Sequence, residues 1–133
     1  MQQFKLTVTT ENRGLHDITS QIASYVADSG LEIGLCHIFI QHTSASLIIN
    51  ENYDVQVQRD LEAFMQRLIP DGDPLFKHVD EGPDDMPSHV KTALTSSSLL
   101  IPISAGKLAL GIYQAIYLWE HRLQQHTRKL IIT

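Results

Sequence analysis

The chain has 133 residues, of which 43% are hydrophobic and 19% are charged, and its formal net charge is -5. This length and composition are typical of one globular domain with its own core, so we assign residues 1–133 to a single domain. The acidic balance argues against nucleic acid or an anionic membrane as a partner. Cys36 is the lone cysteine, which excludes an internal disulfide, and residues 1–5 lack the apolar core of a signal peptide. We therefore expect a cytoplasmic protein without a membrane span.

The N-terminal part of the chain predicts three strands and one helix. Residues 4–9 alternate apolar and polar side chains, which indicates a half-buried strand. Apolar residues then recur at helical spacing over residues 15–26, and Gly30 ends this predicted helix. Residues 31–41 are rich in β-branched and aromatic side chains and predict a second strand, and residues 47–49 predict a third.

A second helix and one long loop follow. Apolar residues at helical spacing predict a helix over residues 57–68, and the acidic and amide side chains of residues 50–54 are typical of the N-cap region of such a helix. Residues 70–87 contain four of the five prolines and show little periodicity. Because long loops inside compact domains usually carry function, this segment is a candidate for the site. A short helix is predicted after Pro87.

The C-terminal part predicts further strands. Residues 99–104 and 107–117 flank Ala105-Gly106 and indicate a hairpin, and residues 129–133 indicate a last strand. The strands are joined mostly by short turns and do not alternate strictly with helices. We therefore predict an α+β fold, a single compact domain in which an antiparallel β-sandwich is accompanied by two to three helices.

The first of three polar clusters covers residues 42–46. His42 ends a predicted strand and is followed by Thr43, Ser44 and Ser46, whose hydroxyl groups can donate hydrogen bonds to phosphate or carbonyl oxygens. The alternative is a turn at the end of a strand, in which these hydroxyls satisfy nearby backbone groups. The chain lacks a Gly-x-Ser-x-Gly motif, which argues against a serine nucleophile.

The second cluster places two imidazoles and four carboxylates in residues 78–89. Imidazole can bind a metal or transfer a proton near neutral pH. His89 would lie in the first turn of the following helix, near Asp84 and Asp85, which could orient it or share a metal with it. No short zinc motif such as His-Glu-x-x-His occurs, and acidic loop residues are often only solvated or cap a helix. We favour a functional site here, and predict that His42, His78 and His89 converge on one pocket as ligands of a divalent ion, zinc or magnesium.

The third cluster covers residues 111–122, which predict a long strand or a pair of strands. Gln114 carries an amide that is costly to bury without partners, and Glu120, His121 and Arg122 place three ionisable groups at the end of the segment. The alternative for these charges is a surface ion pair, which contributes little to stability.

Together these segments resemble the YjbQ-like family, which is also described as the secondary thiamine-phosphate synthase enzymes. The matching segments are HTSASLIINEN at 42–52, EGPDDMPSH at 81–89 and GKLALGIYQAIYLWEHR at 106–122, and the likeness extends over nearly the full chain. The family typically carries Gly-x-Trp-Gln where this chain has Gly111, Ile112, Tyr113 and Gln114. The change from Trp to Tyr113 bears on the shape of the substrate more than on the fold.

The resemblance implies a compact α+β domain around a β-sandwich, assembly as a homotrimer, and a weak thiamine-phosphate synthase activity. That reaction joins hydroxymethylpyrimidine diphosphate to a thiazole phosphate and releases pyrophosphate, so the protein must offset the charge of the leaving group. From this chemistry we infer a catalytic set and a substrate-binding set. The catalytic set is His78, Asp85, His89 and Glu120, and the substrate-binding set is Thr43, Ser44, Ser46, Tyr113 and Gln114.

Two functions from other classes stay open at this point. One is a zinc-dependent hydrolase or lyase, in which His42, His78 and His89 hold the metal and leave a position for water. The other is a protein that binds a small phosphorylated metabolite without changing it. The metal content of the purified protein separates the first alternative from a magnesium-dependent synthase, because zinc co-purifies and magnesium usually does not. Inactive His78→Ala and Glu120→Ala variants that still bind ligand would favour an enzyme over a binding protein.

Overall fold

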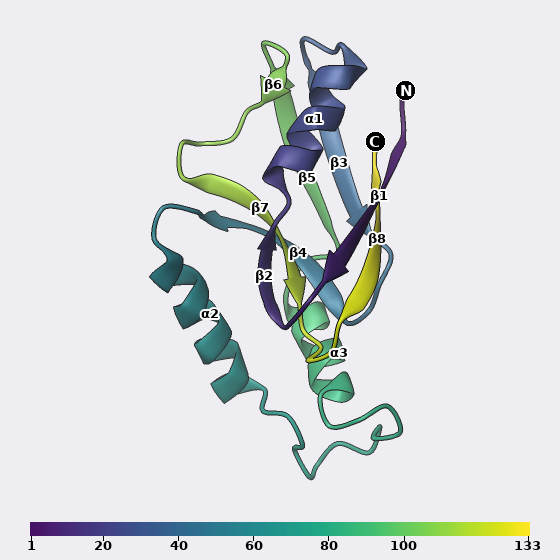
Figure 1. Ribbon diagram of the computed structural model, residues 1–133, viewed down its shortest axis with the longest axis vertical. Helices are drawn as coiled ribbons and strands as arrows, with labels where there is room; N and C mark the ends of the chain where they lie inside the picture. The colour runs from purple at the N-terminus through teal and green to yellow at the C-terminus, as the bar shows by residue number, and fades with distance from the viewer.

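Two antiparallel sheets form the frame of the molecule, which is seen in a computed structural model that describes residues 1–133 (Figure 1). The larger sheet has five strands in the order β1 (Phe4–Thr10), β8 (His126–Ile132), β3 (Gly34–Ile40), β5 (Ser98–Ser104) and β6 (Lys107–Leu108). The smaller sheet has three strands in the order β2 (Gly14–Asp17), β7 (Gln114–Glu120) and β4 (Ala45–Glu51). With three helices added, this architecture confirms the predicted α+β fold with antiparallel sheets.

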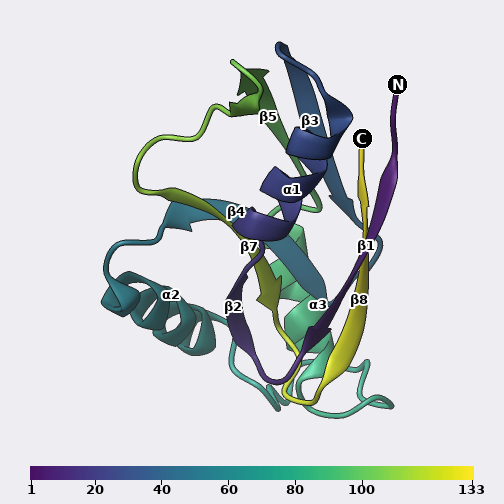
Figure 2. The same ribbon diagram turned by 45° about the horizontal axis from the view of Figure 1, so that its top comes forward.

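The three helices are α1 (Thr19–Ser29), α2 (Val55–Leu68) and α3 (Asp85–Leu94). Helix α1 contributes Ile22 and Val26 to the core between the sheets. Helix α2 lies along the outer side of the smaller sheet, and α3 lies near the end of β7, on the side away from α1 (Figure 2). No helix has the length and apolar character that crossing a membrane requires.

Strand β7 is buried on both faces, which explains its unbroken apolar sequence. Ile116 and Leu118 point into the core cluster between the two sheets. Trp119 points to the opposite face and packs against Met65 and Ile69, from α2 and the residue that follows it. A central strand covered by a sheet on one side and a helix on the other needs apolar residues at successive positions.

The structure corrects the prediction of one strand over residues 107–117. The hairpin turn at Ala105 and Gly106 is confirmed, and both residues have positive φ values of 50° and 78°. The returning strand β6 ends after two residues, however, and β7 begins at Gln114 in the other sheet. Apolar composition could not reveal this change of sheet, because both strands contribute to the same core.

The start of the first helix was also predicted too early. Leu15 lies in β2, where it pairs with Trp119 of β7, and α1 begins only at Thr19. Asp17 marks the boundary, because its carboxylate accepts a hydrogen bond from the backbone N–H of Thr19 at 2.9 Å. The interval from Leu15 to Ile18 fits the helical period, so spacing alone assigned Leu15 to the wrong element.

The ends of the other two helices bear on the site. The prediction of capping before α2 is confirmed, since the Asp54 side chain accepts a hydrogen bond from the Gln56 backbone at 2.9 Å. Helix α3 begins at Asp85, two residues before Pro87, although the sequence predicted it to follow the proline. Proline is tolerated in a first helical turn because its missing N–H has no partner there. The earlier start places Asp85 and His89 one turn apart on the same helix.

Candidate metal centre

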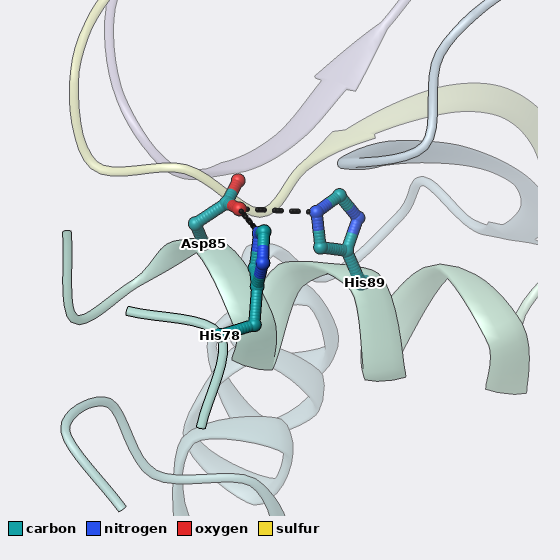
Figure 3. Close-up of side chains that lie close together, drawn as sticks. All are labelled: His78, Asp85 and His89. Atoms are coloured by element: carbon teal, nitrogen blue, oxygen red, sulfur yellow. Dashed lines mark hydrogen bonds and ion pairs between the residues drawn. The ribbon is translucent and has the colours of Figure 1, made fainter. Parts of the chain in front are cut away.

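Three side chains from the second polar cluster point toward one another (Figure 3). Asp85 and His89 stand at positions i and i+4 of α3, and His78 comes from the long loop before the helix. His78 Nε2 lies 2.9 Å from Asp85 Oδ2, and His89 Nε2 lies 3.1 Å from the same oxygen. The three candidate ligand atoms all lie within 4.8 Å of one another.

The Asp85 carboxylate is the buried centre of this group. Asp85 is 1% exposed, and its second carboxylate oxygen, Oδ1, accepts a hydrogen bond from Arg122 Nη1 at 2.7 Å. Burial alone would raise the pKa of Asp85, but the hydrogen bond from His78 and the charges of His89 and Arg122 hold it below its usual value. The carboxylate is therefore ionised at neutral pH, and Arg122 leaves Oδ2 facing the two imidazoles.

Arg122 joins the end of β7 to the start of α3. Its Nε donates to Asp84 Oδ2 at 2.9 Å, and its Nη2 donates to the carbonyl of Glu81 at 2.8 Å. The backbone N–H of Leu123 donates to the same Asp84 oxygen at 2.9 Å. Burial opposes the charge of Arg122, but the hydrogen bond and charge of Asp84 raise its pKa. These contacts fix the helix end from which Asp85 projects.

The surroundings of His89 decide which nitrogen carries its proton. His89 Nδ1 lies 2.8 Å from the carbonyl oxygen of Thr43, which can only accept, so Nδ1 carries the hydrogen. In a neutral ring, Nε2 then presents a lone pair toward the Asp85 carboxylate oxygen. Two electron-rich atoms at 3.1 Å require a cation between them, either a proton on His89 or a metal ion. Orientation of an imidazole by a backbone carbonyl is a common feature of metal sites.

The donor set distinguishes between the two ions that the sequence suggested. Two imidazole nitrogens and one carboxylate oxygen suit zinc and similar transition metals, whereas magnesium prefers oxygen ligands alone. Zinc bonds of 2.0–2.1 Å in a tetrahedral arrangement separate neighbouring ligand atoms by about 3.3 Å. The observed separations of 2.9 and 3.1 Å are close to this spacing, so small side-chain rotations would admit the ion. The residues present therefore fit zinc better than magnesium.

The structure does not bring the ring of His42 into this group. His42 Nε2 accepts a hydrogen bond from the Lys129 backbone at 2.8 Å, and Nδ1 lies 3.3 Å from Arg128 Nη1. Burial, and then the charge of Arg128, lower the pKa of His42. The neighbouring Thr43 reaches the group through its carbonyl oxygen, so the first polar cluster contributes a backbone atom in place of the predicted imidazole.

Glu120 also lies apart from the group of three. It is 0% exposed, and its two oxygens form an ion pair with Arg128, accept from Thr10 Oγ1 at 2.6 Å and accept from the Arg122 backbone at 3.1 Å. Burial opposes ionisation, but the hydrogen bonds from Arg128 and Thr10 hold the pKa of Glu120 below its usual value. With every oxygen engaged in the interior, this carboxylate binds the sheets together and faces no substrate.

The five predicted substrate-binding residues separate into three places. Thr43 and Ser44 line an open groove of about 580 Å³, together with His42, Thr92 and Ser97. His89 adjoins this groove through its contact with the Thr43 carbonyl. Ser46 is fully buried, with its hydroxyl 2.8 Å from His121 Nε2.

Tyr113 and Gln114 lie at the start of β7, whereas Arg122 follows its end. Seven strand residues span about 20 Å, so within one chain these two side chains lie far from the group of three. Tyr113 is 53% exposed and contacts the ring of Tyr53 edge to face at 5.5 Å. The Gln114 side chain accepts a hydrogen bond from the Gly111 backbone at 2.7 Å.

Two contributors to the site were missed in the sequence. Arg122 was assigned to a surface ion pair or left without a role, yet it holds both Asp84 and Asp85. The Thr43 carbonyl gives no sequence signal at all, because every residue carries one. The arginine could have been noticed, since a loop with four carboxylates needs a cation nearby to be buried.

Fold and geometry together define an α+β domain with a candidate centre of two histidines and one aspartate at one end of a β-sandwich. Residues 4–133 match the family model described as UPF0047 protein YjbQ-like. A UPF0047 protein of Synechocystis is 46% identical over 127 residues, covering 96% of this chain and 86% of that protein. The Escherichia coli O157:H7 protein YjbQ is 42% identical over 132 residues, covering 98% of this chain and 95% of that protein. The chain therefore belongs to the YjbQ-like UPF0047 family.

Solved structures agree with this assignment. A Clostridium acetobutylicum protein, described as an uncharacterized conserved member of the same family, has a TM-score of 0.89 at 34% identity and covers 98% of both chains. A hypothetical protein from Aeropyrum pernix has a TM-score of 0.91 at 26% identity, covering 100% of this chain and 97% of that chain. These likenesses extend over the whole fold, including the helix and loop that carry the candidate centre.

Proposed function

We propose that the chain is a metal-dependent enzyme in which His78, Asp85 and His89 bind one divalent transition-metal ion, with zinc the best fit. The observation that carries the proposal is the position of His89, whose Nδ1 is bound to the Thr43 carbonyl while Nε2 faces a carboxylate oxygen. A metal ion resolves this contact without protonating the ring. Three protein ligands would leave one coordination position for water or substrate, as in catalytic zinc sites.

The proposed substrate is a small phosphorylated metabolite in the groove beside His89. Thr43, Ser44 and Ser97 line this groove, and their hydroxyls can donate to phosphoryl oxygens. The Thr92 hydroxyl, at the same groove, already donates to the Ser88 carbonyl at 2.9 Å. Arg122 is occupied by Asp84, Asp85 and the Glu81 carbonyl, so it offers no free charge to a phosphate. A divalent ion at the site would supply that charge and polarise a substrate oxygen.

Thiamine-phosphate synthesis is the narrower form of this proposal. Its departing pyrophosphate needs a cation, and the candidate centre offers one next to a groove of suitable polarity. The heterocycles would need planar partners, and Tyr113 and Tyr53 form an exposed aromatic pair. Because this pair lies about 20 Å away along β7, it could serve the same site only across an interface between copies.

Assembly into a homotrimer is supported by exposed apolar side chains on the larger sheet. Leu35 on β3 and Leu100 on β5 are 61% and 58% exposed, on strands that pair with each other. Apolar side chains of this kind on a sheet are usually covered by another chain. Sedimentation equilibrium at micromolar concentration is expected to give three times the chain mass, and a stable monomer would contradict this assembly.

The test of the metal centre is a competition titration of chelator-treated protein with zinc, manganese and magnesium. We expect one bound ion per chain, with zinc bound more tightly than magnesium. His78→Ala, Asp85→Asn and His89→Ala should each lower zinc affinity at least about tenfold. His16→Ala and His126→Ala are matched controls, because the ring nitrogen of each forms its hydrogen bond to a nearby backbone carbonyl and lies outside the proposed centre. Equal affinity in all five variants would exclude the proposed centre.

Activity is measured on the same metal-loaded samples. Pyrophosphate release from hydroxymethylpyrimidine diphosphate, with and without thiazole phosphate, tests the synthase, and phosphate release from a panel of phosphorylated metabolites tests hydrolysis. Zinc-dependent turnover of the panel without synthesis would leave the metal-dependent enzyme and remove the synthase. Tight metal binding with no turnover of any substrate would favour a binding protein.

A further inference from the structure

Two polar side chains in the interior have no hydrogen-bond partner. They are Lys91, on α3, and His121, directly after β7, and the atoms concerned are Lys91 Nζ and His121 Nδ1. Lys91 is 0% exposed and His121 is 1% exposed. Burial lowers the pKa of Lys91, because an unpaired ammonium group in a protein interior is costly, so the charged form needs a counterion. The metal centre uses neither group, so both require a separate explanation.

The two groups lie on elements that pack against each other, because Arg122, which follows His121, pairs with Asp84 and Asp85 at the start of α3, and Lys91 is buried on the same helix. The charge of Lys91 lowers the pKa of His121 more than any other charge does, ahead of the opposite effect of the adjacent Glu120. Arg13 links them as well. Its Nε donates to the His121 carbonyl at 2.9 Å, and among neighbouring charges it has the largest effect on Lys91.

Ser46 determines the tautomer of His121. The Ser46 hydroxyl lies 2.8 Å from His121 Nε2 and has no other partner. If the hydroxyl accepted from Nε2, its own hydrogen would be buried without an acceptor, so Ser46 donates and Nε2 accepts. Burial, followed by the Lys91 charge, lowers the pKa of His121 to about 3, so the ring is neutral. The hydrogen of the neutral ring is therefore on Nδ1, which becomes a donor.

When Lys91 is in its charged form, both orphan atoms are donors and need an acceptor. The nearby carboxylates are committed elsewhere. Asp71 forms two hydrogen bonds with Arg13, Asp84 accepts from Arg122 and Leu123, and Glu62 accepts from Trp119 and Gln66. A water molecule could accept from both donors, but its own two hydrogens would then need acceptors. Every buried side-chain acceptor already has a partner. A small anion accepts from several donors and has no hydrogen to place.

We propose that Lys91 Nζ and His121 Nδ1 together bind a buried monovalent anion of the chloride class between α3 and the end of β7. The anion offsets the charge of Lys91 and completes the hydrogen bonding of His121. Since α3 also carries Asp85 and His89, the same anion holds the helix that presents the candidate metal ligands. The site does not depend on whether a metal binds there.

The test uses bromide, which replaces chloride and scatters X-rays anomalously. Crystals of the full chain grown from sodium bromide are expected to show an anomalous peak in contact with both nitrogens. An ordered water without anomalous signal at that position, or an empty cavity, would overturn the proposal. This measurement uses the unaltered protein, so its result does not depend on whether a Lys91 variant folds.

A second measurement follows thermal unfolding in sodium bromide and in sodium methanesulfonate at equal ionic strength. Binding of an anion to the folded state alone should raise the Tm in bromide by about 5 °C once the anion is near ten times its Kd. Lys91→Met should abolish this halide response, whereas Lys107→Met, at an exposed position on β6, should retain it. Equal responses in both variants would assign the effect to general surface binding and refute the buried site.

Discussion

Replacing Glu120 by Gln tests whether this buried carboxylate is structural. Glu120 is 0% exposed and Arg128 is 3% exposed, and the two form an ion pair across the neighbouring ends of β7 and β8. Removing the negative charge leaves the Arg128 guanidinium buried without a counterion. Breaking a buried ion pair from one side typically costs about 3–5 kcal/mol. For a chain of this length, the entropy of unfolding is about 0.28 kcal/mol per degree, so the Tm should fall by about 10–18 °C.

The pH dependence gives a second measure of the same pair. The pKa of Glu120 is lower in the folded protein than its usual value, so its ionisation stabilises the fold. This stability is fully present above the unfolded pKa of about 4.3 and is lost as pH falls through the lower folded pKa. The difference between wild type and Glu120→Gln should therefore be large at pH 7 and should shrink below pH 4.

Urea denaturation of both proteins between pH 3 and pH 8 provides the measurement. Glu11→Gln is the matched control, because Glu11 is exposed and its substitution should change the free energy of unfolding by less than about 0.5 kcal/mol. Zinc affinity should be the same in all three proteins. A loss of less than 1 kcal/mol at pH 7, or a loss of zinc affinity with unchanged stability, would refute the structural role and return Glu120 to the site.

Three further outcomes are expected. Arg122→Gln should lower zinc affinity about 10–100-fold in a competition titration, because Asp85 loses the partner of its Oδ1, whereas exposed Arg59→Gln should not. Zinc affinity should fall as the pH is lowered from 7.5 to 5.5, because protons compete for the imidazole nitrogens, whereas the lowered pKa of Asp85 keeps its carboxylate ionised. Zinc affinity that does not change with pH would exclude imidazole ligands. Leu47→Ala should cost about 2–5 kcal/mol in urea denaturation, since Leu47 is fully buried between the sheets, whereas Ile33→Ala, at 82% exposure, should change stability by less than about 0.5 kcal/mol.

The fold class could be predicted from the sequence because it depends on patterns within single elements. Alternation identified β1, and helical spacing together with the acidic cap identified α2. The failures concern where elements end and the short strand β2, which the sequence did not predict. Leu15 satisfied a helical interval while lying in a strand, and residues 107–117 formed one apolar run although the chain changes sheets within it. Both errors have the same cause, because the core needs apolar residues from either element, so apolar character does not reveal which element a residue belongs to.

The candidate site could be predicted only in part, for a different reason. The sequence grouped His78 with Asp85 and His89 because they are close along the chain, and the structure brings the three together. His42 was added because it ends an apolar strand beside small residues, and only the geometry revealed that its Nε2 lone pair is taken by the Lys129 backbone N–H. Residue type indicates which atoms can bind a metal, whereas the surrounding hydrogen bonds determine which lone pairs are free.

Two ionic clusters lie side by side at the end of β7, and their exposures separate their roles. Glu120 and Arg128 are both buried, so their pairing bridges the two sheets and is closed to a ligand. In the group of His78, Asp85 and His89, only Asp85 is buried, whereas the side chains of His78 and His89 are 50% and 30% exposed. A buried carboxylate fixed by Arg122, with two imidazoles open to solvent, can exchange a ligand without disturbing the core. For this reason we propose metal binding at the group of His78, Asp85 and His89, and we assign a structural role to the pair of Glu120 and Arg128.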